Sequence, residues 1–520
     1  MLTNAFVSQK NATFAAMPKK DLLSYIREGR TMTRSERLRL IVQLSVPSIL
    51  AQISATVMFF IDAAMVGHLG EKAIAAIGLV ETTTWLMGGL ASAVNLGFSV
   101  QVAHFIGAND FDSARRVLRQ SLVCALVWSL LLSLVSIAIH SYLPYWLGGS
   151  AEIAHDASLY FVLIGICGVF FQMEGLAASM LKCSGNMKIP SALNIMMCCL
   201  DVVFNYVFIY IFGLGVAGAA LGTGLAELVT ALLMLWFLLW RSDMLRLFNS
   251  EQLIVNSYGY SARDGCEITA ATRGAQAATR GKHGNHNYSL FTINYKLKQF
   301  RPTSDIIGTA FKIGAPMGLN HILMGSAQIV STIIVAPLGT VAIAANSLAI
   351  TVESLCYMPG FGIAEAATTL VGQGIGAGQR ALTRSFANMS VGLGIGVMTF
   401  MGVLMWIFAP ELMTFMTPVE EVIAQGAEAL RIEAWAEPMF AASIVANGVF
   451  IGAGDTLKPT IMNLASMWGV RLTLASWLAR EHGLRGVWTA MAIELTFRGS
   501  IFLTRLFHGG WQKRMIIHNS

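Results

Sequence analysis

Two carboxylates and an amide lie inside segments that are otherwise apolar, where an ionisable group is costly and is usually kept for a function. Asp62 lies in one such segment, and Asp201 and Asn205 lie in another. The second segment places four side chains on one helix face, at the spacing i, i+4, i+7 and i+11: Asn194, Cys198, Asp201 and Asn205. Groups of this kind can bind and release a proton or a cation, so they are candidates for coupling transport to an ion gradient.

The chain carries no motif of the common enzyme classes. It has no GxxxxGKS or GxxxxGKT phosphate loop, no HExxH zinc motif and no GxSxG nucleophile elbow. Its seven cysteines show neither a zinc-ligand spacing nor a disulfide framework, so we expect no enzyme activity and no bound cofactor. Without a nucleotide site, transport would depend on an ion gradient or on a downhill substrate.

The segments that carry these polar residues are long enough to cross a membrane. Hydrophobic residues make up 55% of the 520-residue chain and charged residues 12%, and the mean hydropathy is +0.62. Since about 20 apolar residues span a bilayer, we predict twelve transmembrane helices, at 41–66, 74–104, 117–142, 153–181, 189–212, 215–240, 306–337, 341–373, 385–409, 421–451, 459–479 and 486–507.

The chain also repeats itself at a constant offset of 269 positions. The matching residues are mainly Gly and Pro, which fix turns and kinks and so mark a shared backbone plan. The pairs are Pro47 and Pro316, Leu69-Gly70 and Leu338-Gly339, Gly107-Ala108 and Gly376-Ala377, Gly185 and Gly454, Pro190 and Pro459, and Asn194 and Asn463.

Six helices per repeat means that both copies enter the membrane in the same direction. We therefore expect an all-α integral membrane protein with two six-helix lobes, related by a pseudo-twofold axis along the membrane normal. The predicted organisation is a cytoplasmic N-terminal segment (1–40), an N-lobe (41–241), a cytoplasmic linker (242–305), a C-lobe (306–507) and a cytoplasmic tail (508–520).

Basic residues set the orientation. Of the 35 Lys and Arg residues, only Lys72, Arg480 and Arg485 fall in loops that this topology places outside, and most of the others fall inside. We expect a multi-pass protein of the bacterial plasma (inner) membrane with both termini in the cytoplasm. The net charge of +6 then reflects topology, because the basic residues form no single patch for nucleic acid.

Comparing the two copies separates residues of the shared fold from candidates for function. Asp62 falls opposite Ser331, Asp201 opposite Val470 and Asn205 opposite Leu474. Thr223 joins this set, because Asp62, Asn205 and Thr223 all fall roughly 6 to 12 Å inside the outer surface at about 1.5 Å per residue. The alternative for each is an interhelical hydrogen bond with no part in transport.

At these residues the chain resembles the multidrug and toxic compound extrusion (MATE) family. The resemblance covers about Leu40 to Phe507 and rests on several motifs in order: Phe60-Ile61-Asp62 through Gly70, Gly107-Ala108-Asn109-Asp110, Gly218 to Thr223, Val371 to Gly378, and Gly454-Asp455-Thr456. It implies a V-shaped pair of lobes that exports cationic or amphipathic drugs as a monomer, in exchange for protons or sodium.

The resemblance also assigns roles to individual residues. The family's first-helix acid falls on Asp62, its helix-bending proline on Pro47, its helix-five polar positions on Asp201 and Asn205, and a helix-six threonine on Thr223. We expect Asp62, Asp201 and Asn205 to bind the coupling proton or Na⁺ and the first helix to bend at Pro47. The order of Asp and Asn in helix five is reversed relative to some members, and the acids of the C-terminal site of another branch fall on Met324 and Phe440.

Further ionisable residues in the spans are expected mainly to pair between helices. In the C-lobe we expect Glu353, Glu365, Glu433, Glu437 and Glu494 to pair with Arg431, Arg471 and Arg498. Glu437, before a proline in the tenth span, and Asn194 are the candidates for lining the substrate cavity.

Three alternatives remain at this point. A lipid-linked oligosaccharide flippase or exporter of related architecture would need several basic residues in its cavity, which only Arg431, Arg471 and Arg498 could supply. A membrane receptor would show no gradient-dependent flux. A major facilitator transporter has two six-helix halves, but its basic turn after the second span is poorly matched by Gly107 to Arg116.

Overall fold

The computed structural model describes residues 22–247 and 300–513, so most of the predicted 242–305 linker and parts of both predicted cytoplasmic ends lie outside the described residues. Within the two described ranges the chain is helical and has no strand. Nine single helices there are long and apolar enough to cross a membrane, and one bent pair passes as a tenth span.

The N-lobe contains six long helices, as the repeat predicted. The chain enters it through a short helix, α2 (Leu22–Arg27). The six spans are α3 (Arg34–Gly67), α4 (Glu71–Gly107), α5 (Phe111–Ile139), α7 (Ala151–Cys183), α8 (Lys188–Tyr206) with the π-helical turn η1 (Val207–Ile211), and α9 (Gly215–Trp236) with η2 (Phe237–Arg241); α6 (Leu143–Trp146) is a short connection.

The C-lobe repeats this order. Its spans are α13 (Ser304–Val335), α14 (Thr340–Gly376), α15 (Arg380–Ile407), the bent pair α17 (Glu420–Ala434) and α18 (Glu437–Gly452), α19 (Leu457–Ser466) with η5 (Met467–Arg471), and α20 (Leu472–His508); η4 (Ala336–Leu338), α16 (Ala409–Met416) and η6 (Gly510–Lys513) are short connections. Gly483 has φ 58° and ψ −138°, so α20 breaks there. Its first part continues α19 as the eleventh span, its second part is the twelfth, and the predicted twelve helices are confirmed.

Helix α3 begins before the apolar stretch that predicts it. Thr33 and Glu36 form a capping box: Glu36 N donates to Thr33 Oγ1 (3.2 Å) and Thr33 N donates to Glu36 Oε2 (3.0 Å). The helix therefore starts at Arg34, inside the segment predicted to precede the first span. Hydrophobicity locates the membrane-embedded part of a helix, whereas the capping residues locate its end.

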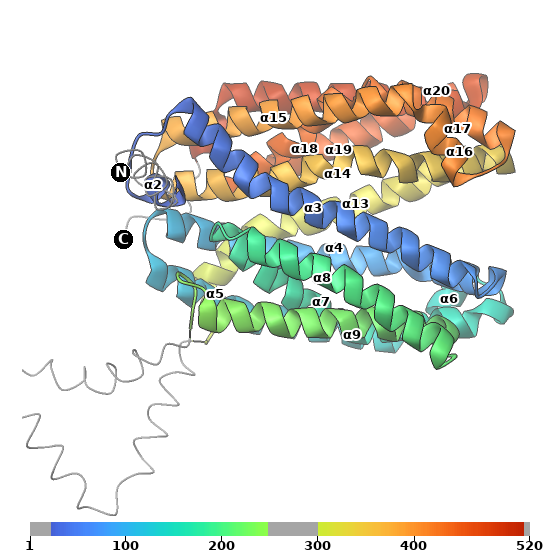
Figure 1. The fold of residues 1–520 in the computed structure, drawn as a ribbon, viewed down its shortest axis with the longest axis horizontal. Coiled ribbons are helices and arrows are strands. Elements are labelled where there is room, and N and C mark those ends of the chain that lie inside the picture. Colours follow the sequence, from blue (N-terminus) through green and yellow to red (C-terminus); the bar gives the residue numbers. More distant parts are fainter. Residues whose placement is uncertain (1–21, 248–299, 514–520) are drawn as a thin grey trace, which may run out of the picture.

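Helices α3 and α13 cross between the lobes (Figure 1). The part of α3 near its N-terminal end packs on the C-lobe, where Leu40 and Leu44 share a core with Leu370 and Phe386. This end of the molecule is called inner and the opposite end outer, as the basic residues predict. Its outer end returns to the N-lobe, where Val66 packs on the helices that follow Asp201. Helix α13 does the reverse, since its inner end joins the N-lobe core through Ala310 and its outer half packs within the C-lobe. Each lobe thus holds part of the other's first helix.

The lobes touch most closely at their inner ends, where two glycines of the repeat meet. A Cβ on Gly107 of α4 would lie 2.0 Å from the Gln373 carbonyl oxygen of α14, and a Cβ on Gly376 would lie 2.0 Å from the His104 carbonyl oxygen. Only glycine permits this approach of the two backbones. The two contacts are related by the repeat, so the pseudo-twofold axis passes between them.

The hydrogen bonds between the lobes fall on the same side of the molecule. Helix α2 is held at its end by both lobes, because Gln379 Nε2 donates to the Ile26 carbonyl and Asn109 Nδ2 donates to the Arg27 carbonyl. Across the described residues, hydrogen bonds link the two lobes from this inner end to about the middle of α3, at Gln52. The lobes are therefore joined on the inner side.

Candidate functional site

The three residues predicted to bind the coupling ion lie together in the N-lobe. Asn205 Nδ2 of α8 donates to Asp62 Oδ1 of α3 (3.0 Å) and to Asp201 Oδ2, one turn away on α8 (3.0 Å). Asp201 and Asn205 are 0% and 1% exposed, whereas Asp62 is half-buried. One amide therefore joins an accessible carboxylate to a fully buried one.

This cluster has more acceptor oxygens than donors. Asp201 Oδ1 and Asn205 Oδ1 are buried and receive no hydrogen bond in the described part of the chain. A buried, unpaired carboxylate oxygen is costly unless a proton or a cation neutralises it. The unsatisfied oxygens are therefore where such an ion fits, although no group of three or more His, Cys, Asp or Glu side chains in the described ranges is arranged as a metal site.

Gly222 on α9 makes the cluster possible. A Cβ at this position would lie 2.1 Å from Asn205 Oδ1 and 2.8 Å from the Asn205 backbone nitrogen. Helix α9 can approach α8 closely only because residue 222 has no side chain. The next residue, Thr223, lies beside Asp201 as predicted, and its side chain interacts with that carboxylate.

Sequence reasoning missed a third acid, Glu227, which lies one turn after Thr223 on α9. It is 5% exposed, and its Oε2 receives no hydrogen bond from the described residues. Glu227 interacts electrostatically with Asp201 and with Glu174 of α7. Two signals could have found it: the i, i+4 spacing from Thr223, and its counterpart in the second copy, Thr496.

Asn194, predicted to line the substrate cavity, forms a hydrogen bond with Glu174. With its amide oriented to suit its neighbours, Asn194 Nδ2 donates to Glu174 Oε1 (2.9 Å) and to the Pro190 carbonyl (3.0 Å). Glu174 also interacts electrostatically with Lys182 and Glu365. The polar residues of the N-lobe thus continue from the Asp62 cluster toward the interface between the lobes.

Pro47 lies inside α3, which continues through it as one helix. A proline has no N–H to donate, so the Gln43 carbonyl loses its partner one turn earlier. Pro47 lies within the part of α3 that packs on the C-lobe, because Ile49 and Gln52 beyond it still contact that lobe. Asp62 lies further along the helix, so the missing hydrogen bond falls on the C-lobe side of the point where α3 passes to the N-lobe.

Glu437, the second candidate for the substrate cavity, is fully buried in the C-lobe. Glu437 and Glu433 are both 0% exposed, and none of their four carboxyl oxygens has a hydrogen-bond partner among the described residues. Glu437 begins α18 just after the bend that separates it from α17. In this conformation it faces protein and not an open cavity.

Of the acid–base pairs predicted in the C-lobe, the described residues contain one, between Arg498 and Glu494; Glu353, Glu433 and Glu437 form no salt bridge there. Arg498 Nε lies 3.0 Å from Glu494 Oε1, in a buried pair within α20. Arg431 is exposed and lies over the Trp406 ring at 5.8 Å, so it pairs with no buried acid. Glu365 was expected to pair with an arginine, and it pairs instead with Lys182 of the other lobe.

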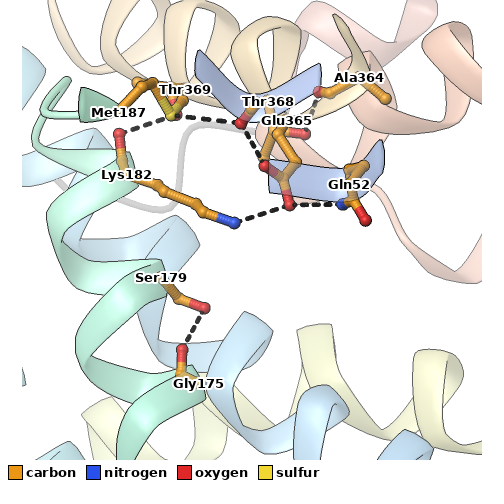
Figure 2. A network of polar contacts seen from close by, with 10 residues as sticks. Gln52, Gly175, Ser179, Lys182, Met187, Ala364, Glu365, Thr368 and Thr369 are labelled. Carbon is orange, nitrogen blue, oxygen red and sulfur yellow. Dashed lines mark hydrogen bonds and ion pairs between the residues drawn. The ribbon is translucent and has the colours of Figure 1, made fainter. Parts of the chain in front are cut away.

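Figure 2 shows this pair within a network that joins α3, α7 and α14. Lys182 Nζ lies 2.8 Å from Glu365 Oε1, and Gln52 Nε2 donates to the same oxygen at 3.4 Å. Ser48, next to Pro47, donates to Glu365 Oε2 at 2.5 Å. Lys182 lies in the last turn of α7. Its partner comes from the other lobe, which helix periodicity does not reveal.

Comparison with known proteins gives one family for both halves. The MatE family model matches residues 47–207 and 316–477, so its two copies start 269 positions apart, as the repeat does. The chain is 23% identical over 483 residues to a probable multidrug resistance protein NorM of Thermotoga maritima, covering 92% of this chain and 94% of that protein.

Solved structures share the fold. A crystal structure of MATE in complex with MaL6 superposes with a TM-score of 0.80 at 19% identity, covering 96% of this chain and all of that one. A MOP superfamily transporter from Pyrococcus furiosus, described as having a binding pocket of reverse polarity, gives 0.79 at 19% identity with the same coverage. The two-lobe architecture predicted from the repeat is therefore confirmed.

Proposed function

The chain belongs to the MatE family, and on that premise we propose that it is a secondary active antiporter, which exports cationic or amphipathic organic compounds in exchange for protons or sodium ions. We place it in the plasma membrane of a bacterium, with both termini in the cytoplasm. The NorM name of its relatives supports multidrug efflux as the general activity.

The Asp62, Asn205 and Asp201 cluster carries this proposal. It combines an accessible carboxylate with a buried one that has an unsatisfied oxygen, and the second copy of the repeat has Ser331, Val470 and Leu474 in their places. A purely structural hydrogen-bond network would satisfy its buried acceptors. This one retains acceptors for an ion.

The geometry supports a particular order of ion uptake. Asp62 is the least buried member, so it takes up a proton or Na⁺ from outside, and Asn205 places that ion next to Asp201. Neutralising Asp62 alters the charge carried by α3, which passes from the N-lobe through Pro47 to the C-lobe. Alternating access then follows from rearrangement of α3 at the proline, because it is the helix that both lobes share.

The experiment is efflux of the fluorescent cation ethidium from proteoliposomes, with an imposed pH gradient compared with an imposed sodium gradient. Asp62→Asn keeps the size of the side chain and should abolish gradient-driven efflux while the protein remains folded and inserted. Glu411→Gln, which removes an exposed acid at the outer end of the C-lobe, is the matched control and should leave efflux unchanged. Normal efflux by Asp62→Asn contradicts the proposal.

The flippase alternative finds no support in the basic residues of the C-lobe. It needs several cations facing one cavity for a pyrophosphate. Arg498 is paired with Glu494 inside α20, and Arg431 lies over Trp406 at an exposed position. The antiporter therefore remains the function that the site favours.

A further inference from the structure

Glu365 is a C-lobe carboxylate that accepts hydrogen bonds from three side chains of the N-lobe. Ser48 and Gln52 approach it from α3 and Lys182 from α7, at 2.5, 3.4 and 2.8 Å (Figure 2). The ammonium of Lys182 is the single positive charge among them. This arrangement is a binding site for an ammonium group, and it is occupied by a side chain of the protein itself.

The pair remains in contact with solvent, unlike the structural pair of the C-lobe. The Lys182 and Glu365 side chains are 20% and 29% exposed, compared with 10% and 0% for Arg498 and Glu494. Glu365 therefore keeps exposed surface at which a second cation can make contact. Lysine is suited to leaving such a site, because its ammonium is carried on a flexible stem of four carbons.

The repeat shows that the common fold does not need this pair. Lys182 falls opposite Ile451 in the second copy, and Glu365 falls opposite Leu96 in the first. The equivalent helices pack without either charge. Burial of a charge within a membrane protein that the fold does not require indicates a functional use.

We propose that Glu365 binds the positively charged group of an exported organic cation, and that Lys182 displaces this cation when the inner ends of the lobes close. The proposal rests on the proposed function and names a substrate contact for it. Lys182 and Glu365 lie on opposite lobes, on the side where the lobes are joined here, so opening of the inner side separates them and leaves Glu365 free for a cation from the cytoplasm.

Closure then returns Lys182 to Glu365. One carboxylate needs one neutralising charge, so the ammonium of Lys182 replaces that of the substrate, which leaves on the outer side. Glu174 supports Lys182 while the two are apart, because it lies two turns earlier on α7 and interacts electrostatically with it. Lys182 therefore has a carboxylate neighbour in each state of the cycle, which limits the cost of moving its charge within the membrane.

The test measures ethidium affinity for the purified protein by fluorescence, together with ethidium efflux from proteoliposomes. Lys182→Met removes the internal competitor and should bind ethidium about tenfold more tightly, a change of about 1.4 kcal/mol, while exporting it more slowly. Glu365→Gln should bind about tenfold more weakly. The double variant should follow Glu365→Gln. Lys182→Gln replaces Lys182→Met if the latter fails to fold.

The opposite signs distinguish displacement from a structural bridge. If the salt bridge between Lys182 and Glu365 is only structural, both single variants should lose thermal stability to the same extent. Their ethidium affinities should then change in the same direction or stay unchanged. This result overturns the proposal. Lys72→Met and Glu152→Gln, which break an exposed ion pair in the outer half of the N-lobe, are the controls and should leave affinity unchanged. If the wild-type protein shows no gradient-driven ethidium flux, the proposed function is overturned as well. If wild-type flux is normal but the two variants shift ethidium affinity in the same direction, only displacement of the substrate by Lys182 is overturned.

Discussion

Gly107→Ala should shift the protein toward a conformation that is open on the inner side. The new Cβ would lie 2.0 Å from the Gln373 carbonyl oxygen, a distance at which the two backbones must move apart by about 1 Å. Overpacking of this kind costs about 1 to 3 kcal/mol, which corresponds to a change of about 5- to 150-fold in the ratio of inner-closed to inner-open molecules.

The assay is the distance between spin labels at Arg116 and Arg380, exposed inner positions of α5 and α15, in a chain whose native cysteines have been replaced. Gly107→Ala should lengthen this distance and reduce ethidium efflux. Gly88→Ala lies on the same helix with no atom within 4 Å of its Cβ, so it controls for the change in helix propensity. Identical distance distributions for the two variants would refute the role of the glycine contact in inner closure.

Two further predictions concern other buried groups. Gly222→Ala places a Cβ 2.1 Å from Asn205 Oδ1, so it should abolish gradient-driven ethidium efflux while ethidium binding is retained. Loss of both efflux and binding contradicts a role of Gly222 that is confined to the ion site. Glu494→Gln leaves the Arg498 charge buried beside a neutral amide and should destabilise the protein by about 3 to 5 kcal/mol, seen as a lower thermal unfolding temperature in detergent; an unchanged temperature contradicts the assigned pairing.

The fold could be predicted because its determinants are local or repeat along the chain. The lengths of the apolar segments predicted the twelve spans. The Gly and Pro residues that match between the two copies marked positions where the backbone has a special role. Gly107 and Gly376, found only as a repeated pair, turn out to be where the lobes touch. The ends of helices were less predictable, because they depend on capping residues such as Thr33 and on a break such as that at Gly483.

The site was predicted in part. Asp62, Asp201 and Asn205 meet as expected, because helix spacing placed Asp201 and Asn205 on one face and the resemblance to the MATE family assigned them to one site with Asp62. Lys182 and Glu365 were not predicted to meet, because their contact depends on which helices the two lobes bring together. Hydrophobic periodicity describes the face of each helix, but it does not name the helix that the face will contact.

The positions of the buried acids suit the exchange that the function requires. Asp201 interacts with Glu227, Glu227 with Glu174, and Glu174 with both Lys182 and Glu365, so charge at the outer cluster is connected to the interlobe pair through the N-lobe. An ion bound at Asp62 and Asp201 reduces the negative charge along this series, which leaves Glu365 as the stronger attraction for Lys182. Ion uptake from outside would then favour the closed inner side and release of the exported cation. A Glu227→Gln variant tests this connection, and ethidium efflux that still depends on the imposed gradient as in the wild type would refute it.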